Sequence, residues 1–350
     1  MVGQYIKNSN LINNQLKTKY INLSTSVTVE EIGKNGIKKW LRYVNLLFKT
    51  FYFGLFWRPS LVYITLSSHG GGLIKDSLVV FICRLLGLKH VFHFHNKGVK
   101  NYANTKIGKF LYPLVFKKAE VILLSPLLYQ DIEDFVPTER VHFCANGIPN
   151  FETKSIHKNI QENKPIHLLF LSNLIYSKGV WEVLEACCIL KEKELPFHCT
   201  LAGGVGDISV NEVQSFISKN QLSKQVKYVG KVSGSIKTKV LEQADVFLHP
   251  TKEDCFPLVL LEAMQFGLPI ISTYEGAIPE MVEDGVNGYL IPKNKAEALA
   301  TVIEKYINNL DLILKQGNQN TVKYQKQYQL KVFEDNFLKI INKISNKTKT

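Results

Sequence analysis

The chain has 350 residues, 45% of them hydrophobic, and a formal net charge of +13 at pH 7. This length and composition suit two α/β domains with separate buried cores and exclude a disordered or fibrous protein. The charge is concentrated in residues 1–150, which hold 19 Lys and Arg against 8 Asp and Glu, while residues 151–350 hold 24 against 22. The basic first half favours an anionic lipid or a polyanionic sugar acceptor. Because no zinc-finger, helix-turn-helix or RNP pattern accompanies the charge, no nucleic-acid partner is expected.

The sequence contains neither a signal-peptide pattern nor a run of 18 apolar residues, which argues against secretion and membrane spanning. Its six cysteines lack the paired spacing of metal ligands, as expected for small buried side chains in a reducing compartment. We therefore expect a cytoplasmic protein with no metal site. The aromatic-rich stretch from Leu46 to Trp57 is flanked by basic residues. It predicts either an interfacial helix at the inner face of a membrane or a core helix packed on a sheet.

Short apolar runs alternate with longer helical patterns along the chain, which is typical of parallel βαβ units. In the first half, strands are predicted at 60–66, 90–94, 121–125 and 141–144, and helices at 75–86, 105–117 and 127–134. The start of the chain is already helical in pattern after Gly3. The strand and glycine loop that normally open such a domain are therefore missing, because the start is trimmed or mis-assigned or because the strand is absent.

A polar, aperiodic stretch at residues 151–164 is predicted to link a first domain, residues 1–150, to a second, residues 165–327. Residues 328–350 follow as a terminal helix. In the second domain, strands are predicted at 167–172, 198–202, 226–229, 246–249, 269–272 and 288–291, with helices between them. Ligands of doubly wound sheets bind at the carboxyl ends of the strands. The expected fold class is therefore α/β, with two Rossmann-like, doubly wound domains facing across a cleft.

The most informative motif reads ADVFLHPTKEDCFPLVLLEAMQFGLPIISTYEGAIPEMVEDGVNG and spans residues 244–288. A predicted strand is followed by a loop and then by a helix with Pro257 in its first turn, where a missing N–H costs least. The unpaired amides and positive dipole end of this helix suit a diphosphate. We therefore expect the helix start to bind a donor through Phe256, Pro257 and Leu258.

Two carboxylates lie on either side of this predicted helix start. Glu262 lies just over a turn inside the helix and leans back toward its N-terminus, so its carboxylate is placed to accept hydrogen bonds from ribose hydroxyls. Asp254, in the loop ahead of the helix, is placed to hold hydroxyls of a transferred sugar, and Glu253 is a candidate to share this task. The alternative interpretation makes Asp254 a helix N-terminal charge and Glu262 a solvated surface residue.

Three more segments place polar residues or glycines at strand ends. Lys178 is the second-last residue of LLFLSNLIYSKG and is placed to neutralise the charge of a leaving nucleoside diphosphate. An isolated lysine, however, is more often ordinary surface charge. Gly203, in LAGGVG, allows close backbone approach to a ligand. His95 follows an apolar strand and is a candidate contact for the donor sugar or the acceptor. A metal role for His95 is disfavoured because acidic and cysteine partners are missing nearby.

Together these motifs resemble the retaining glycosyltransferases of family 4, the glycogen-synthase-like group with the GT-B architecture. The family's pattern E-G-F-G-x-x-x-x-E-A-M-x-x-G-x-P reads D-C-F-P-L-V-L-L-E-A-M-Q-F-G-L-P here, with Asp254 and Glu262 at the two acidic positions. Lys178 fits the lysine of the family's G-R-L-x-x-x-K-G pattern, whereas Asn173 stands where the family has arginine. The resemblance is strongest from about residue 167 to 291, and it implies that a helix at 332–344 crosses back onto the first domain.

The resemblance implies that a hexose is transferred from a nucleoside-diphosphate sugar with its anomeric configuration retained, without a bound metal or cofactor. In the transition state the sugar becomes cation-like while negative charge gathers on the diphosphate. The leaving phosphate can accept the acceptor's proton, so no enzymic nucleophile is needed. The acceptor is expected to be a glycan or lipid-linked molecule of cell-envelope polysaccharide assembly. The implied catalytic residues are Lys178, Asp254 and His95, and the implied donor-binding residues are Asn173, Gly203, Glu253, Phe256, Pro257, Leu258 and Glu262.

Other function classes explain less of the sequence. A glycoside hydrolase also uses two carboxylates but needs neither an anion-binding helix start nor Lys178. A nicotinamide-dependent oxidoreductase needs a G-x-G-x-x-G loop opening a βαβ unit, which the sequence lacks. The main alternative is a truncated, non-catalytic protein that binds a nucleotide sugar or scaffolds a biosynthetic complex without turnover.

Overall fold

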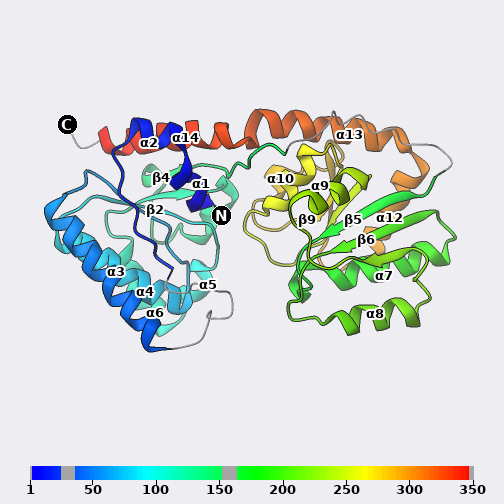
Figure 1. Cartoon of the computed structure of the whole chain (residues 1–350), viewed down its shortest axis with the longest axis horizontal. Coiled ribbons are helices and arrows are strands. Elements are labelled where there is room, and N and C mark those ends of the chain that lie inside the picture. The colour runs from blue at the N-terminus through cyan, green and yellow to red at the C-terminus, as the bar shows by residue number, and fades with distance from the viewer. Residues whose placement is uncertain (1, 25–35, 152–163, 347–350) are drawn as a thin grey trace. The chain divides into compact units, whose positions relative to one another are not determined.

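The computed structural model describes residues 2–24, 36–151 and 164–346. It divides into two compact units, one formed by Met1–Ala145 with Phe333–Thr350 and the other by Asn146–Val332 (Figure 1). The first unit thus ends at residue 145, where the sequence predicted 150. The predicted linker at 151–164 lies outside the described residues, apart from its two end residues.

The first unit is built on a parallel sheet with the strand order β1-β2-β3-β4. Every residue of β2 and β3 is buried, as expected where both faces of a parallel sheet are covered. Ahead of β1, the regular elements of the described residues are all helices. The strands are β1 (Val62–Ile64), β2 (His90–His93), β3 (Glu120–Leu123) and β4 (Val141–Phe143).

Three helices of the first unit lie side by side (Figure 1). α4 (Gly70–Leu85) follows β1 and α6 (Lys106–Val115) follows β2, so right-handed crossovers place both on the same face of the sheet. α3 (Ile37–Phe56) packs against α4. The other helices of this unit are α1 (Val2–Asn8), α2 (Asn10–Gln15), α5 (Val99–Ala103) and most of α14 (Leu330–Asn346), whose Phe337 ring lies 5.2 Å from that of Tyr63 in β1.

Two predicted helices of the first half differ from those in the structure. The helix predicted at 75–86 begins earlier, at Gly70, because three successive glycines continue the helix from an extended His69 instead of forming a loop. The segment predicted as a helix at 127–134 is the short 3-10 helix Pro126–Asp131. Its start is fixed by the side chain of Ser125, which accepts a hydrogen bond from the N–H of Leu127.

The second unit contains a six-stranded parallel sheet with the order β10-β9-β8-β5-β6-β7. The chain first builds outward from β5 to β7 and then crosses back to β8, so the strand order reverses between β5 and β8. Ligands of open α/β sheets bind at such a switch point, outside the carboxyl ends of the strands. The strands are β5 (Ile166–Leu171), β6 (Phe197–Ala202), β7 (Val226–Tyr228), β8 (Val246–His249), β9 (Ile270–Thr273) and β10 (Gly288–Ile291).

The central strands β5 and β8 are buried apart from the half-buried His167, with Phe170 and Leu248 among the least exposed side chains. Within the described residues, no helix combines the length and the apolar character needed to cross a bilayer. The helices of this unit are α7 (Val180–Glu192), α8 (Val210–Lys219), α9 (Gly234–Gln243), α10 (Leu258–Gln265), α11 (Ile278–Met281), α12 (Ala296–Asn308) and α13 (Leu310–Lys323).

Candidate functional site

Two loops meet at the switch point of the second sheet, one following β5 and the other following β8. The loop after β5 ends at Gly179, whose φ of 85° lies in the left-handed region and whose Cβ, if present, would lie 2.2 Å from the carbonyl oxygen of Pro250. Only glycine allows the two loops to approach this closely. The carbonyl of Ser177 also accepts hydrogen bonds from the N–H of Lys252 and the hydroxyl of Thr251, at 2.7 and 3.1 Å. These contacts fix the position of Lys178.

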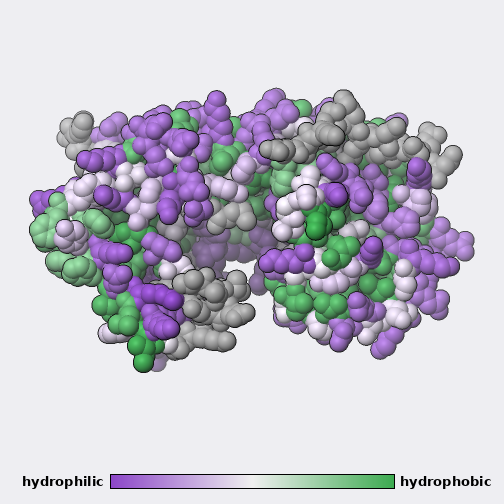
Figure 2. All heavy atoms as spheres, viewed as in Figure 1, coloured by the Kyte–Doolittle hydropathy of each residue, from purple (hydrophilic) through white to green (hydrophobic). Residues whose placement is uncertain are grey.

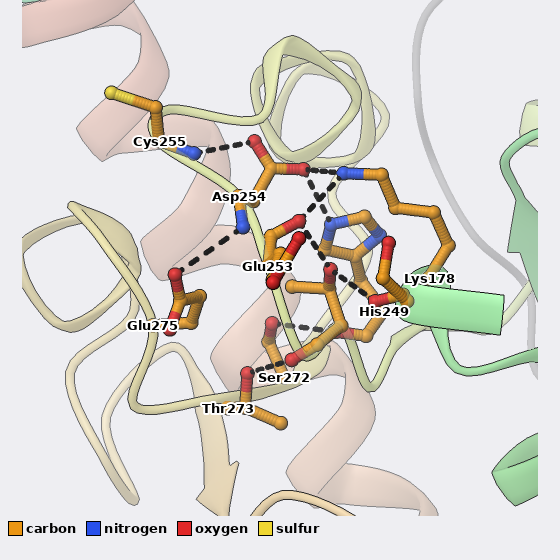
Figure 3. Close-up of polar contacts among 10 residues, drawn as sticks. Lys178, His249, Glu253, Asp254, Cys255, Ser272, Thr273 and Glu275 are labelled. Atoms are coloured by element: carbon orange, nitrogen blue, oxygen red, sulfur yellow. Dashed lines mark hydrogen bonds and ion pairs between the residues drawn. The ribbon is translucent and has the colours of Figure 1, made fainter. Parts of the chain in front are cut away.

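Lys178 forms an ion pair with Asp254 across these two loops (Figure 3). Its Nζ lies 2.6 Å from Oδ2 of Asp254 and donates a second hydrogen bond, of 2.8 Å, to the carbonyl of Glu253. Both side chains are largely buried, with 23% and 17% of their surface exposed. The structure therefore brings together two of the predicted catalytic residues. Glu253 contributes its backbone to this contact, while the residue itself is exposed.

Two basic neighbours control the charge of Asp254. Burial by itself would raise the pKa of this carboxyl, but His249 and Lys178 outweigh burial and hold the pKa below its usual value. Nε2 of His249, at the end of β8, lies 3.5 Å from Oδ2, at the outer limit of a hydrogen bond. Asp254 is therefore ionised at neutral pH, and its oxygens act as hydrogen-bond acceptors for hydroxyl groups.

The backbone of the Asp254 loop is held by the segment that follows β9. The N–H of Asp254 donates to Glu275 over 3.4 Å (Figure 3). The N–H of Ala277 donates to the carbonyl of Cys255 over 2.9 Å. Gly276 lies at φ 53°, and a Cβ there would lie 2.3 Å from the carbonyl oxygen of Asp254. A side chain at Gly276 would therefore push the acidic loop away from Lys178.

The helix start predicted to bind a diphosphate belongs to α10, which begins at Leu258. Pro257 is the N-cap residue, one position earlier than predicted, because its ψ of 110° is extended and not helical. Among the described residues no side chain caps this helix, although the N–H of Leu260 donates to the carbonyl of Pro257 over 3.1 Å. Phe256 is buried, and its ring packs 6.2 Å from that of Tyr328, so only its backbone can serve a ligand.

Glu262, one turn inside α10, is paired with a lysine that the sequence did not single out. Its Oε1 lies 2.5 Å from Nζ of Lys237 in α9, while its buried Oε2 has no hydrogen-bond partner among the described residues. Burial raises the pKa of Glu262, and the charge of Lys237 opposes this effect. The predicted surface alternative for Glu262 is wrong, because only 7% of the residue is exposed. One carboxylate oxygen is thus held in place and the other is left without a partner.

Asn173 and Gly203 shape the backbone beside Lys178 at the ends of β5 and β6. The side-chain oxygen of Asn173 accepts a hydrogen bond of 3.0 Å from the N–H of Gly204. Asn173 therefore links two loops, where an arginine would extend a charge toward phosphate. Gly203 is packed so tightly that a Cβ would lie 1.8 Å from the carbonyl oxygen of Ser172.

Gly203→Ala should destabilise the second unit by about 1–3 kcal/mol, because the added methyl group cannot fit without moving the backbone. Gly204→Ala is the matched control, since its Cβ would meet side chains and not backbone, Asn173 at 3.2 Å and Lys231 at 3.8 Å. Urea unfolding of both variants measures the difference. Equal stability of the two variants would contradict this account of Gly203.

His95, the third predicted catalytic residue, lies in the first unit, two residues after β2. Its ring centroid is 4.2 Å from that of His93, and neither of its ring nitrogens has a hydrogen-bond partner. Burial lowers the pKa of His95 to about 4. The imidazole is therefore neutral at neutral pH and has one N–H donor and one acceptor nitrogen to offer a ligand.

Sequence reasoning missed Lys237, His249 and Gly276. His249 could have been found, because it ends the strand that precedes the acidic loop. Lys237 gives no signal, since it lies 25 residues before Glu262 in an ordinary amphipathic helix. Among the described residues, no three His, Cys, Asp or Glu side chains gather as a set of metal ligands.

The region that contains this site matches a known protein family. Residues 151–325, half of the chain, match the family described as glycosyl transferases group 1. The chain belongs to this family. It is 31% identical over 231 residues to the amylovoran biosynthesis glycosyltransferase AmsK of Erwinia amylovora, covering 63% of this chain and 55% of the relative. It is 29% identical over 205 residues to the putative colanic acid biosynthesis glycosyltransferase WcaL of Salmonella typhimurium, covering 56% and 49%.

Solved structures share the fold of this chain. HepE of Anabaena in complex with UDP has a TM-score of 0.72 at 18% identity, with 85% of this chain and 82% of that chain covered. A glycosyltransferase from Rickettsia africae has a TM-score of 0.70 at 18% identity, with 89% and 83% covered. The predicted fold class, GT-B with two Rossmann-like α/β domains, is confirmed. The chain spans about half the length of the curated relatives that it matches.

Proposed function

We propose that this glycosyl transferases group 1 protein is a family 4 enzyme that transfers a hexose from a nucleoside-diphosphate sugar and retains the anomeric configuration. The observation that carries the proposal is the Lys178–Asp254 pair at the switch point, beside the uncapped start of α10. A cation and free amide N–H groups suit the diphosphate, while ionised carboxylates suit sugar hydroxyls. Neighbouring structures include HepE solved with UDP.

Each site residue has a chemical role in this reaction. As the bond from C1 to the diphosphate breaks, negative charge grows on the leaving phosphate, and Lys178 and the α10 amides stabilise it. Asp254 holds hydroxyls of the transferred sugar, and Glu262 uses its unpartnered Oε2 to accept hydrogen bonds from the ribose. Neutral His95 serves as a hydrogen-bonding contact for the sugar or acceptor. The acceptor oxygen bonds to C1 as its proton passes to the leaving phosphate, so no enzymic nucleophile is needed. Lys178 and the α10 amides supply the positive charge, so the reaction needs no bound metal.

The acceptor that we propose is a glycan or lipid-linked molecule of cell-envelope polysaccharide assembly. The names of the relatives support this class, since one is a glycosyltransferase of amylovoran biosynthesis and another a putative glycosyltransferase of colanic acid biosynthesis. Such lipid-linked acceptors lie at the membrane surface. We accordingly place the protein in the cytoplasm, in peripheral contact with the inner face of an anionic membrane.

Thermal unfolding with UDP-, GDP- and ADP-sugars tests the donor assignment. One donor class should raise the melting temperature, because ligand binding to the folded state stabilises it by mass action. Glu262→Ala should remove most of this shift, since the ribose contact is lost. If none of the donors raises the melting temperature, the proposed function is overturned. A shift without sugar transfer to any acceptor would favour the non-catalytic alternative.

A further inference from the structure

The first unit exposes apolar side chains along one face of α3. Nine large hydrophobic residues of this helix are at least 39% exposed, and they recur at the three- and four-residue spacing of a single helix face. The opposite face is the one that packs, because Leu46, Thr50 and Gly54 are buried. The exposed residues are Ile37, Trp40, Leu41, Val44, Phe48, Phe51, Tyr52, Leu55 and Phe56.

The two neighbouring helices extend this face. α4 exposes Ile74, Leu78 and Leu85, and α6 exposes Ile107, Phe110 and Leu114, again at helical spacing. The hydroxyl of Tyr43 in α3 donates to the carbonyl of Lys75 in α4 over 2.8 Å, and the Arg84 guanidinium in α4 donates to the carbonyl of Leu114 in α6. Figure 2 shows hydrophobic residues gathered over this edge of the first unit, with hydrophilic ones between them. We call the exposed residues of α3, α4 and α6 the three-helix face.

The charges of the three helices all favour an anionic partner. Asp76 is their single acidic residue, and it is 1% exposed. Lys38 and Lys49 of α3 and Lys106 and Lys109 of α6 are exposed. A second copy of the chain would bring the same basic surface against this one, and like charges repel. An apolar stripe bordered by Lys and exposed aromatic rings is the arrangement by which a helix lies in a lipid headgroup region.

We propose that the three-helix face is the surface that docks this protein on an anionic lipid bilayer. This inference deepens the membrane contact of the proposed function by naming the surface that makes it. Trp40, Phe48 and Phe56, at 65%, 65% and 71% exposed, enter the boundary between headgroups and acyl chains. The lysines interact with the anionic headgroups, so binding requires both apolar and basic residues.

Co-sedimentation of the full chain with vesicles tests the three-helix face. The protein should bind vesicles of phosphatidylcholine with phosphatidylglycerol and bind pure phosphatidylcholine far more weakly, and salt should weaken binding. The triple variant Trp40→Ser, Phe48→Ser and Phe56→Ser should lose binding by about tenfold or more, since it removes three of the most exposed apolar side chains of α3. The triple variant Ile236→Ser, Val286→Ser and Leu314→Ser removes exposed apolar residues of the second unit and should bind like the parent chain.

Three results would overturn the inference: no binding to anionic vesicles, equal loss of binding in both triple variants, or a dimer in solution that only the α3 variant dissociates. Nucleotide-sugar binding, measured by thermal unfolding of the same variants, should be unchanged. A failure of the membrane surface is thereby distinguished from a failure of the proposed donor site.

Discussion

Replacing Lys178 with methionine should lower the rate of sugar transfer by about 10²–10³-fold, because the growing charge on the leaving diphosphate loses its nearest cation. The expectation rests on the 2.6 Å contact of Lys178 with Asp254 and on its fixed position between the two loops. The change also leaves Asp254 with His249 as its remaining basic neighbour. Initial rates are measured as release of nucleoside diphosphate, with the donor that gives the largest thermal shift.

Lys224→Met provides a matched control, because Lys224 is an exposed lysine of the same unit with no role in the site. It should transfer sugar at the parental rate. A Lys178→Met variant that folds, binds donor and keeps more than about a tenth of the parental kcat would show that Lys178 is not part of the reaction.

Replacing Lys237 with methionine should destabilise the second unit by about 1–3 kcal/mol at neutral pH, because it leaves the buried carboxylate of Glu262 without its counter-charge. This loss of stability is smaller than for a fully buried ion pair, because 22% of the Lys237 side chain is exposed. Donor binding should weaken as well, because a Glu262 that becomes protonated or moves no longer presents a fixed oxygen to the ribose.

The pH dependence of the stability of Lys237→Met tests whether the buried charge of Glu262 causes the loss. Burial already raises the pKa of Glu262, and loss of Lys237 should raise it further. For a carboxyl whose folded pKa lies above its unfolded value, stability is greatest below the unfolded pKa and is lost as pH rises through the folded pKa. The stability deficit of Lys237→Met should therefore be large at about pH 7.5 and small at about pH 4. Urea unfolding at both pH values measures it.

A second substitution separates charge from packing. Glu262→Gln in the Lys237→Met background removes the buried charge, so it should recover much of the lost stability, while donor binding stays weak. Lys237→Arg should preserve the pair and behave close to the parent chain. A deficit that is equal at both pH values and is not relieved by Glu262→Gln would mean that Lys237 only fills space.

The sequence predicted the strands of the second unit well because their signals are local. A buried parallel strand appears as a continuous apolar run, and β5, β6, β8 and β9 all fall within a few residues of their predicted positions. Helix starts were less predictable. Pro257 became a cap instead of a first-turn residue, and the glycines at 70–72 became part of α4, because tertiary packing decides whether a terminal turn forms.

The sequence also predicted the two acidic residues of the switch-point site, since motif spacing places Asp254 and Glu262 on either side of a helix start. It could not supply their partners. Lys237 approaches Glu262 from a separate helix, and His249 approaches Asp254 only because the loop turns back toward the end of β8. Contacts between residues far apart in sequence depend on the packing of whole elements.

The sequence by itself determined the fold class, the broad assignment as a glycosyltransferase and the residues of the acidic motif, because apolar periodicity and motif spacing are properties of short segments. Only the tertiary structure decided that Glu262 is buried with one free oxygen and that Asn173 ties two loops together. It also showed that the stretch from Leu46 to Trp57 lies in a helix that buries one side and exposes apolar side chains on the other, so the interfacial interpretation stays a prediction. Burial and exposure belong to the assembled structure, since the same apolar helix face is core or surface according to whether another element covers it.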